Sequence, residues 1–117
     1  RTLIDCNMTI GSHSCSHPKM IDLAPADIES ELAISKATIE EYLGGTCRHF
    51  CVPYGTPGLH YEPKEIIQHV AKAGYVSLAT GVRGSRAKGS NPIVLERDQL
   101  LAGAGNYQHR YFFGRHN

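Results

Sequence analysis

The chain has 117 residues, enough for one ordinary domain and too few for a second of typical size. Hydrophobic residues make up 41% and charged residues 20%, a globular rather than a disordered composition. With 12 basic and 11 acidic side chains the net charge is +1, so nothing favours a nucleic-acid partner. No apolar run is long enough to span a bilayer, and no signal peptide is visible. We therefore expect a single domain over residues 1–117, with no membrane segment.

The four cysteines leave the redox state open. Cys6, Cys15, Cys47 and Cys51 could form two disulfides in a secreted protein or stay as four thiols in a cytosolic one. Four cysteines allow three pairings, and buried thiols without any redox role are an equal alternative. The sequence accordingly assigns no compartment, and secreted, periplasmic and cytoplasmic locations all remain open.

A long amphipathic helix is predicted from Pro25 to the Gly44-Gly45 pair. Proline suits the first helical turn, and glycine ends a helix well. Apolar residues recur near helical spacing on one face. They are Ile28, Leu32, Ile39 and Leu43. The residues available for the exposed face are Asp27, Glu29, Glu31, Lys36, Glu40 and Glu41.

The rest of the chain alternates short strands with one more helix. A strand is predicted at residues 8–10, before Gly11. The second helix covers residues 62–73, and the aromatic tail at residues 107–113 predicts a last strand. Further strands are predicted at residues 48–52, 75–79 and 93–95. Strands that alternate with helices indicate an α/β protein with a parallel sheet.

Two histidines stand four residues apart in the segment Gly-Ser-His-Ser-Cys-Ser-His-Pro, residues 11–18. On a helical turn this spacing places both side chains on one face, where His13 and His17 would converge on one cation. Neutral imidazole is a good ligand for zinc and for other borderline divalent ions. Two surface histidines without a ligand are the competing interpretation, because the chain has 7 histidines and the spacing alone is a weak signal.

The strand predicted at residues 48–52 runs directly into Pro53, Tyr54 and Gly55. A strand that ends this way presents a rigid backbone corner at the carboxyl edge of the sheet. Sites in parallel α/β proteins form at that edge. Taken alone, the segment is equally well explained as an ordinary turn after a buried strand.

Together and in order, these segments resemble the polysaccharide deacetylases of carbohydrate esterase family 4, also called the NodB-homology domain. Residues 10–18 resemble the second family motif: Gly, a small residue, His, Ser or Thr, two residues, then His-Pro. Residues 50–55 resemble the third motif, a strand end with Pro-Tyr-Gly. Residues 73–81 resemble the Gly-Tyr strand, and residues 95–97 resemble an arginine-bearing segment. The resemblance covers residues 10–97, most of the chain.

The resemblance implies an α/β fold, a partial or distorted (β/α) barrel with parallel strands. It implies a divalent metal held by one Asp and two His, so His13 and His17 would be two ligands. Zinc is expected first, with cobalt and nickel as alternatives. Tyr54 would be catalytic through a backbone amide that donates to an oxyanion, with Pro53 and Gly55 placing it against the substrate. The reaction would remove acetyl groups from N- or O-acetylated sugars of a polysaccharide.

One part of the family pattern is missing. The first motif, a strand that ends in Asp-Asp-Gly, supplies the catalytic base and the third ligand, and the sequence has no Asp-Asp pair. The resemblance places this motif before Arg1, which would make the chain the C-terminal portion of a deacetylase-like domain. Cys51 also stands where many members have an arginine. A homo-oligomer, or a partner chain that supplies the missing strand, is another way to complete the site.

Two alternatives remain at this point. A non-catalytic relative, either carbohydrate-binding or degenerate, would need no aspartates, and an upstream Asp-Asp strand separates it from an enzyme. A structural zinc site from Cys47, Cys51, His17 and Cys15 has unusual spacing and would draw Cys51 out of a buried strand. The late histidine that donates a proton in the family is not visible, and we interpret His109 as a surface residue.

Overall fold

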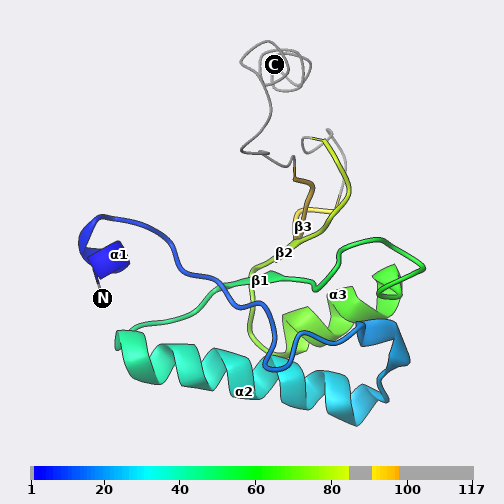
Figure 1. Ribbon diagram of the computed structural model, residues 1–117, viewed down its shortest axis with the longest axis horizontal. Helices are drawn as coiled ribbons and strands as arrows, with labels where there is room; N and C mark the ends of the chain where they lie inside the picture. The colour runs from blue at the N-terminus through cyan, green and yellow to red at the C-terminus, as the bar shows by residue number, and fades with distance from the viewer. Residues whose placement is uncertain (1, 85–90, 98–117) are drawn as a thin grey trace.

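The structure, a computed structural model, describes residues 2–84 and 91–97. In chain order the elements are α1 (Thr2–Asp5), the 3-10 turn η1 (Met20–Asp22), α2 (Pro25–Leu43), β1 (His49–Cys51), α3 (Pro63–Lys72), β2 (Ser77–Ala79) and β3 (Val94–Leu95). The strands form one parallel sheet in the order β1-β2-β3, with α2 and α3 on the same side of it (Figure 1). The predicted α/β fold with parallel strands is confirmed. The strand predicted at residues 107–113 lies outside the described residues.

A single residue before α2 extends the sheet beyond β1. Ser12 pairs in parallel with Phe50, donates its N–H to the carbonyl of His49 at 2.8 Å and accepts from the N–H of Cys51 at 2.8 Å. The strand predicted at residues 8–10 is therefore wrong, since the pairing begins later. Gly11 explains the shift, because a Cβ there would lie 3.0 Å from the carbonyl oxygen of His49. A larger residue there would force the His49 backbone to shift slightly, so the close approach to β1 favours glycine.

The predicted long helix is confirmed as α2. Pro25 occupies its first turn, and Gly44 ends it in the left-handed conformation at φ 69°, with its N–H donating to the carbonyl of Glu40 at 2.9 Å. Ile28 and Leu32 are buried on the side that faces the sheet. None of the described helices is long and apolar enough to cross a membrane.

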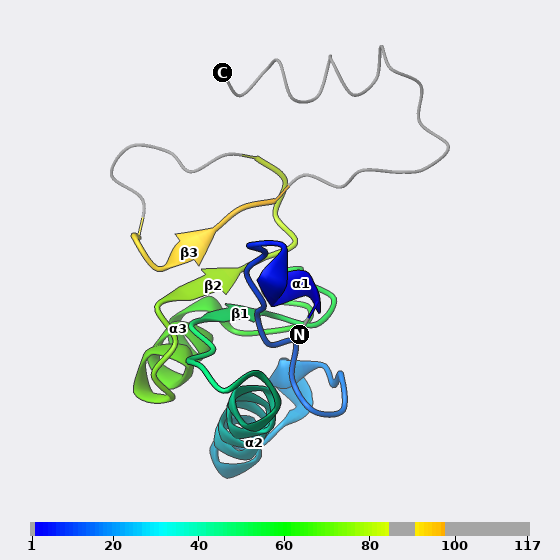
Figure 2. The same cartoon turned by 90° about the vertical axis from the view of Figure 1, so that its left-hand side faces the viewer.

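The second predicted helix is confirmed as α3. Glu62 caps its first turn by accepting the N–H of Glu65 at 2.8 Å, and Pro63 follows at the first helical position. Ile66 and Val70 are buried and Ile67 is partly buried, so the apolar residues that recur at helical spacing face the core. The side view in Figure 2 shows α2 and α3 beneath the three strands.

The core lies between the two helices and one face of the sheet. In β1 only Phe50 is fully buried, and its ring lies 5.5 Å from that of Tyr75. His49 and Cys51, on either side of it, point the other way because successive strand residues alternate between faces. The sheet therefore has one face covered by helices and one face turned away from them. The buried apolar residues are Met20, Ile28, Leu32, Cys47, Phe50, Val52, Tyr61, Ile66, Val70, Tyr75 and Leu78.

Candidate metal and catalytic site

His13 lies at the carboxyl edge of the sheet and lines a cavity of about 410 Å³ on the face that carries no helix. The preceding Ser12 is buried toward α2, and strand alternation sends His13 to the opposite face. The Nδ1 atom of His13 lies 2.8 Å from the carbonyl oxygen of Cys51. Because a carbonyl only accepts, Nδ1 of the neutral ring carries the proton and Nε2 keeps a free lone pair.

His17 reaches His13 through a loop rather than a helix. The ring centroids of the two histidines lie 4.7 Å apart with an interplanar angle of 65°. Ser14 and His17 adopt left-handed backbone conformations at φ 70° and φ 56°, and the Ser14 hydroxyl accepts the N–H of His17 at 3.0 Å. The predicted helical turn is therefore wrong, although the side chains do meet. A proline directly after His17 disfavours helical dihedrals at that residue, which accounts for the difference.

Tyr54 occupies the corner that follows β1, and its ring lies 4.7 Å from that of His17. Tyr54 and Gly55 both have left-handed dihedrals, at φ 64° and φ 88°. Within residues 2–84 and 91–97 the backbone N–H of Tyr54 donates to no acceptor, so this amide is available. The structure thus brings together three of the predicted site residues at one edge of the sheet.

Pro53 and Gly55 fix the backbone turn at Tyr54 through contacts with the interior of the protein. Pro53 is fully buried, and Gly55 packs against the backbone of Gly81, whose N–H donates to the Gly55 carbonyl at 2.9 Å. A Cβ on Gly55 would lie 2.5 Å from the nitrogen of Gly81. Neither residue lines the cavity. Their predicted contribution to substrate binding would therefore be indirect, by fixing the orientation of the Tyr54 backbone.

His60 forms the outer side of the corner, its ring 5.1 Å from that of Tyr54. Its Nδ1 atom accepts the N–H of Thr56 at 3.0 Å, so in the neutral ring Nε2 carries the proton. The Tyr54 ring, 54% exposed, is thereby flanked by a histidine on each side.

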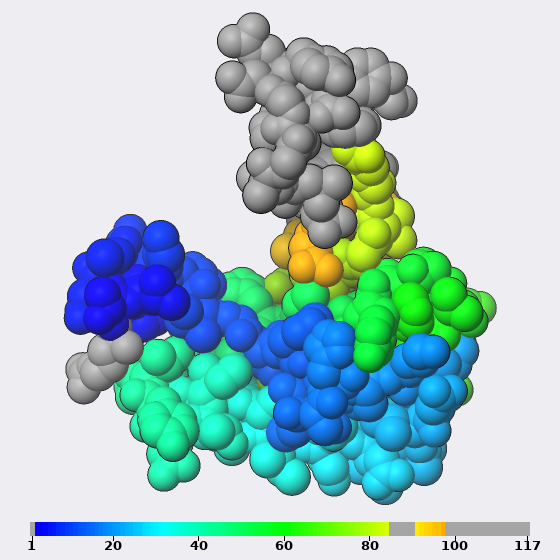
Figure 3. Space-filling view, viewed as in Figure 1, coloured from blue at the N-terminus to red at the C-terminus, as the bar shows by residue number. Residues whose placement is uncertain are grey.

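Glu31 supports the segment of residues 13–17, here called the histidine loop, and this role was not identified from the sequence. The loop packs over α2 in the space-filling view of Figure 3. One Glu31 oxygen accepts the N–H groups of Cys15 at 2.8 Å and Ser16 at 3.0 Å, and the other accepts the Ser16 hydroxyl at 2.6 Å. The periodic pattern had assigned Glu31 to the exposed face of the helix. Its position three residues after the buried Ile28 was the available signal.

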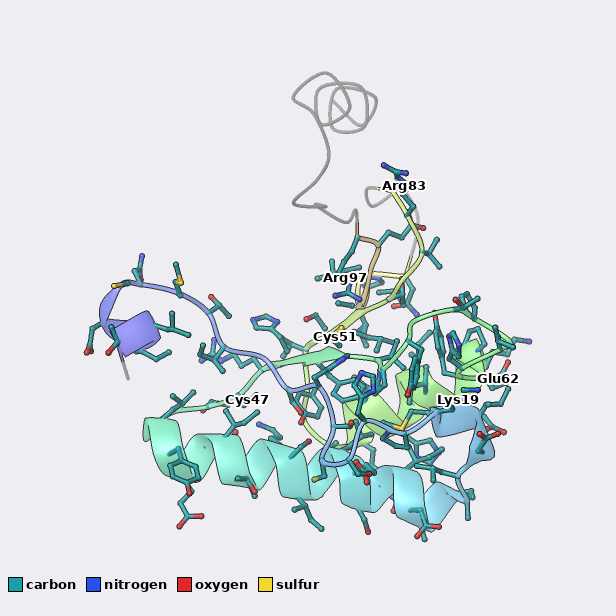
Figure 4. All side chains as sticks on the ribbon, in the orientation of Figure 1. Lys19, Cys47, Cys51, Glu62, Arg83 and Arg97 are labelled. Carbon is teal, nitrogen blue, oxygen red and sulfur yellow. The ribbon has the colours of Figure 1, made fainter. Side chains whose placement is uncertain are left out.

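Polar groups also line the cavity beyond His13. The Nδ1 atom of His49 lies 2.7 Å from the hydroxyl of its strand partner Ser77. Arg97 donates its Nε–H to the Thr80 carbonyl at 2.7 Å and lies on the opposite side of β1 from α2 (Figure 4). Burial raises the pKa of the Cys51 thiol, against the opposing effect of the Arg97 charge. Cys51 and Arg97 thus line the same cavity, close enough for the arginine charge to act on the thiol.

The residues present fit part of a metal site. His13 and His17 offer two converging imidazoles, and the carbonyl that holds His13 Nδ1 is the usual outer partner of a metal-binding histidine. In the part of the chain that the structure describes, no three His, Cys, Asp or Glu side chains lie close enough to hold an ion. The alternative zinc site is wrong for the same reason: Cys47 is 0% exposed and points into the core, away from Cys15. All four cysteines are free thiols.

Comparison with known sequences gives one family. Residues 1–78 match the sequence profile described as polysaccharide deacetylase, which is more than half of the chain. None of the curated protein sequences matches.

Several solved structures are similar. The Streptococcus pyogenes deacetylase PplD in complex with acetate has a TM-score of 0.76 at 18% identity, over 90% of this chain and 44% of that one. A family 4 carbohydrate esterase from Streptomyces lividans in complex with acetate has a TM-score of 0.58 at 29% identity, over 68% and 38%. A mutant CE4 family pseudoenzyme with restored enzymatic activity has a TM-score of 0.56 at 23% identity, over 66% and 26%. The chain thus spans less than half the length of these relatives.

Proposed function

The chain belongs to the polysaccharide deacetylase family, and from this premise we propose that it takes part in metal-dependent hydrolysis of acetyl groups on N- or O-acetylated sugars of a polysaccharide. The structure has the mixed α/β fold with parallel strands that these deacetylases share. Two relatives are described in complex with acetate, the product of such a reaction. The substrate, the metal and the activity of the whole protein are part of this proposal.

The observation that carries the proposal is the convergence of His13 and His17 beside the Tyr54 corner. The rings lie 4.7 Å apart, and the bond from His13 to the Cys51 carbonyl leaves the His13 Nε2 lone pair free. Among the described residues, the Tyr54 N–H beside them donates to no acceptor, so a donor and two candidate ligands lie at the same edge of the sheet. The arrangement supports a site in which both imidazoles hold one divalent ion, with zinc expected first.

Each residue has a distinct role in the proposed reaction. His13 and His17 would hold the ion, which supplies Lewis acidity toward an acetyl carbonyl and toward water. The N–H of Tyr54 would donate to the carbonyl oxygen as it gains negative charge, and the buried Pro53 and the Gly55 contact fix its direction. A third ligand and a general base must come from outside the described residues. A homo-oligomer or a partner chain that supplies that strand stays a prediction.

Elemental analysis of the purified full chain tests the proposal. We expect about one equivalent of zinc, cobalt or nickel after reconstitution, and loss of it in both His13→Ala and His17→Ala. His69→Ala is the matched control, because His69 lies on α3 beside Glu29 and far along the chain from the loop. Release of acetate from acetylated oligosaccharides then tests the reaction. A chain that binds no metal, or binds it equally without His13, would contradict the proposed site.

A second candidate function rests on the incomplete ligand set. Residues 2–84 and 91–97 bring together no group of three metal donors, and two similar structures are mutants of a CE4 family pseudoenzyme, one of them with restored enzymatic activity. A non-catalytic relative that binds carbohydrate would show saturable binding of acetylated oligosaccharides without acetate release. Metal bound in the unmodified chain, together with acetate release, would exclude this candidate.

A further inference from the structure

The histidine loop is strained and needs support from outside itself. Ser14 and His17 are non-glycine residues with left-handed dihedrals, at φ 70° and φ 56°. Such residues cost on the order of 1–3 kcal/mol each, and they persist only where the surrounding structure holds them. The bond from the His17 N–H to the Ser14 hydroxyl lies within the loop and cannot fix the loop against the sheet. The position of His17 relative to His13 therefore depends on contacts with other elements.

Glu31 on α2 supplies the strongest of these contacts. Its two carboxylate oxygens accept three hydrogen bonds from two consecutive loop residues, Cys15 and Ser16, at 2.6 to 3.0 Å. Hydrogen bonds to an ionised carboxylate are about twice as strong as those between neutral groups. Burial by itself would raise the pKa of Glu31, but the bonds from Ser16 and Cys15 outweigh it and lower the pKa below its ordinary value. The carboxylate is therefore charged and directed at the loop.

A second contact comes from the same stripe of α2, one turn later. Ser35 accepts the hydroxyl proton of Ser12 at 2.7 Å and donates its own to the carbonyl of Leu32 at 3.1 Å. Residues four apart on a helix lie on one face, so Glu31 and Ser35 can both form hydrogen bonds with the segment that carries His13, one at each of its ends. The helix thereby fixes the loop at Ser12 on one side of His13 and at Cys15 and Ser16 on the other.

We infer that Glu31 is the positioning residue of the histidine pair, setting the separation of the His13 and His17 rings and with it the affinity of the site for a divalent ion. The inference rests on the proposed metal function. Glu31 is not itself a ligand, because both of its oxygens are occupied by loop donors and it joins no three-donor group among the described residues. It acts on the segment between the two histidines, through the N–H groups of Cys15 and Ser16 and the Ser16 hydroxyl.

Metal titration of three variants tests the inference. Glu31→Gln keeps the size of the side chain but removes its charge. The amide oxygen can still accept the two N–H groups and the amide NH2 can only donate to the Ser16 hydroxyl, so all three bonds lose their charge assistance. Glu41→Gln is the matched control, an exposed carboxylate on the last turn of the same helix. Ser16→Ala removes only the hydroxyl bond. The full chain, stripped of metal, is titrated with Co²⁺ by visible absorption and with Zn²⁺ in competition with a chromogenic chelator.

We expect Glu31→Gln to bind both ions about tenfold or more weakly, the scale of outer-residue changes at metal sites. Ser16→Ala should weaken binding less, and Glu41→Gln should match the unmodified chain. The Co²⁺ spectrum should also change in Glu31→Gln, because ligand geometry alters the absorption bands. A role limited to stability would leave the spectrum and affinity of the folded variant unchanged.

The outcomes separate the inference from the proposed function. If the unmodified chain binds metal, His13→Ala does not and Glu31→Gln binds as well as Glu41→Gln, the inference is overturned while the metal site stands. If the unmodified chain binds no metal, the inference and the proposed metal site fail together. If Glu31→Gln does not fold, as judged by far-ultraviolet circular dichroism, Ser16→Ala decides: full affinity and an unchanged Co²⁺ spectrum overturn the inference, and reduced affinity supports it.

Discussion

The two faces of the sheet differ in chemistry although the same short strands form both. On the face covered by α2 and α3, Phe50 and Leu78 are buried and packed into the core. On the other face, one residue away along each strand, His49 and Ser77 form a polar pair beside the cavity. Strand alternation makes this division possible, because neighbouring residues never compete for the same side.

Within the three residues of β1, one residue stabilises the core and its neighbours carry the polar groups at the cavity. In β1, Phe50 faces the helices, whereas the carbonyl of Cys51 holds the His13 ring at the cavity. The covered face requires only apolar side chains of suitable volume, and many sequences satisfy that requirement. The cavity face carries particular polar residues, among them His13, one of the two histidines on which the proposed function depends.

The largest expected difference between the two faces is in packing. Phe50→Ala should destabilise the chain by about 3–5 kcal/mol, because Phe50 is fully buried and a cavity would remain in the core. Leu95→Ala on the cavity face should cost at most about 0.5 kcal/mol, since Leu95 is already 37% exposed. Urea unfolding of both variants, followed by circular dichroism, measures the two values. Equal losses would mean that the cavity face is packed as tightly as the covered one.

The covered face is also the part of the fold that the sequence predicts best. Ile28 and Leu32 in α2, and Ile66 and Val70 in α3, recur at helical spacing, and all four are buried. Hydrophobic periodicity records which side of an element is buried, so elements that pack by one apolar stripe are recoverable from it. The strands predicted at residues 48–52, 75–79 and 93–95 lie within two residues of the observed β1, β2 and β3, whereas the one predicted at residues 8–10 was wrong.

The histidine loop shows what periodicity misses. The pairing of His13 with His17 was predicted, but the helical turn expected to achieve it was wrong. Left-handed dihedrals at Ser14 and His17 depend on support from α2, and that support is a tertiary contact of Glu31. The spacing of Glu31 from Ile28 places it at the border of the apolar stripe, but spacing alone does not distinguish a polar residue that makes a tertiary contact from an exposed one. The predicted roles of Tyr54 and its neighbours remain predictions.

The next difference concerns access to two thiols. Burial raises the pKa of both Cys47 and Cys51, so both are poor nucleophiles near neutral pH. Cys47 is 0% exposed within the covered core, whereas Cys51 is half-buried beside the cavity. We expect iodoacetamide to modify Cys47 about a hundredfold more slowly than Cys51, which corresponds to about 2.8 kcal/mol of local opening. Peptide mass spectrometry over time measures both rates.

The exposed Cys6 provides the reference for that experiment and should react fastest. In concentrated urea the rates at Cys47 and Cys51 should converge, because unfolding removes the difference in access. Labelling of Cys47 as fast as Cys51 in the native chain would show that the covered face opens readily, and the contrast between the two faces would then be lost.

The smallest expected difference concerns hydrogen bonds. On the covered side, the buried Tyr75 hydroxyl donates to the Leu32 carbonyl at 3.0 Å, and burial raises its pKa so that it stays protonated. Tyr75→Phe should cost about 1 kcal/mol, since no water reaches the groups left behind. Ser77→Ala removes a bond of similar length to His49, but His49 borders the cavity, where water can replace the lost hydroxyl. We expect a loss within about 0.5 kcal/mol there. Because both changes remove one hydroxyl from a buried residue, unfolding measurements on the pair isolate the effect of the face itself, and a larger loss for Ser77→Ala would reverse the comparison.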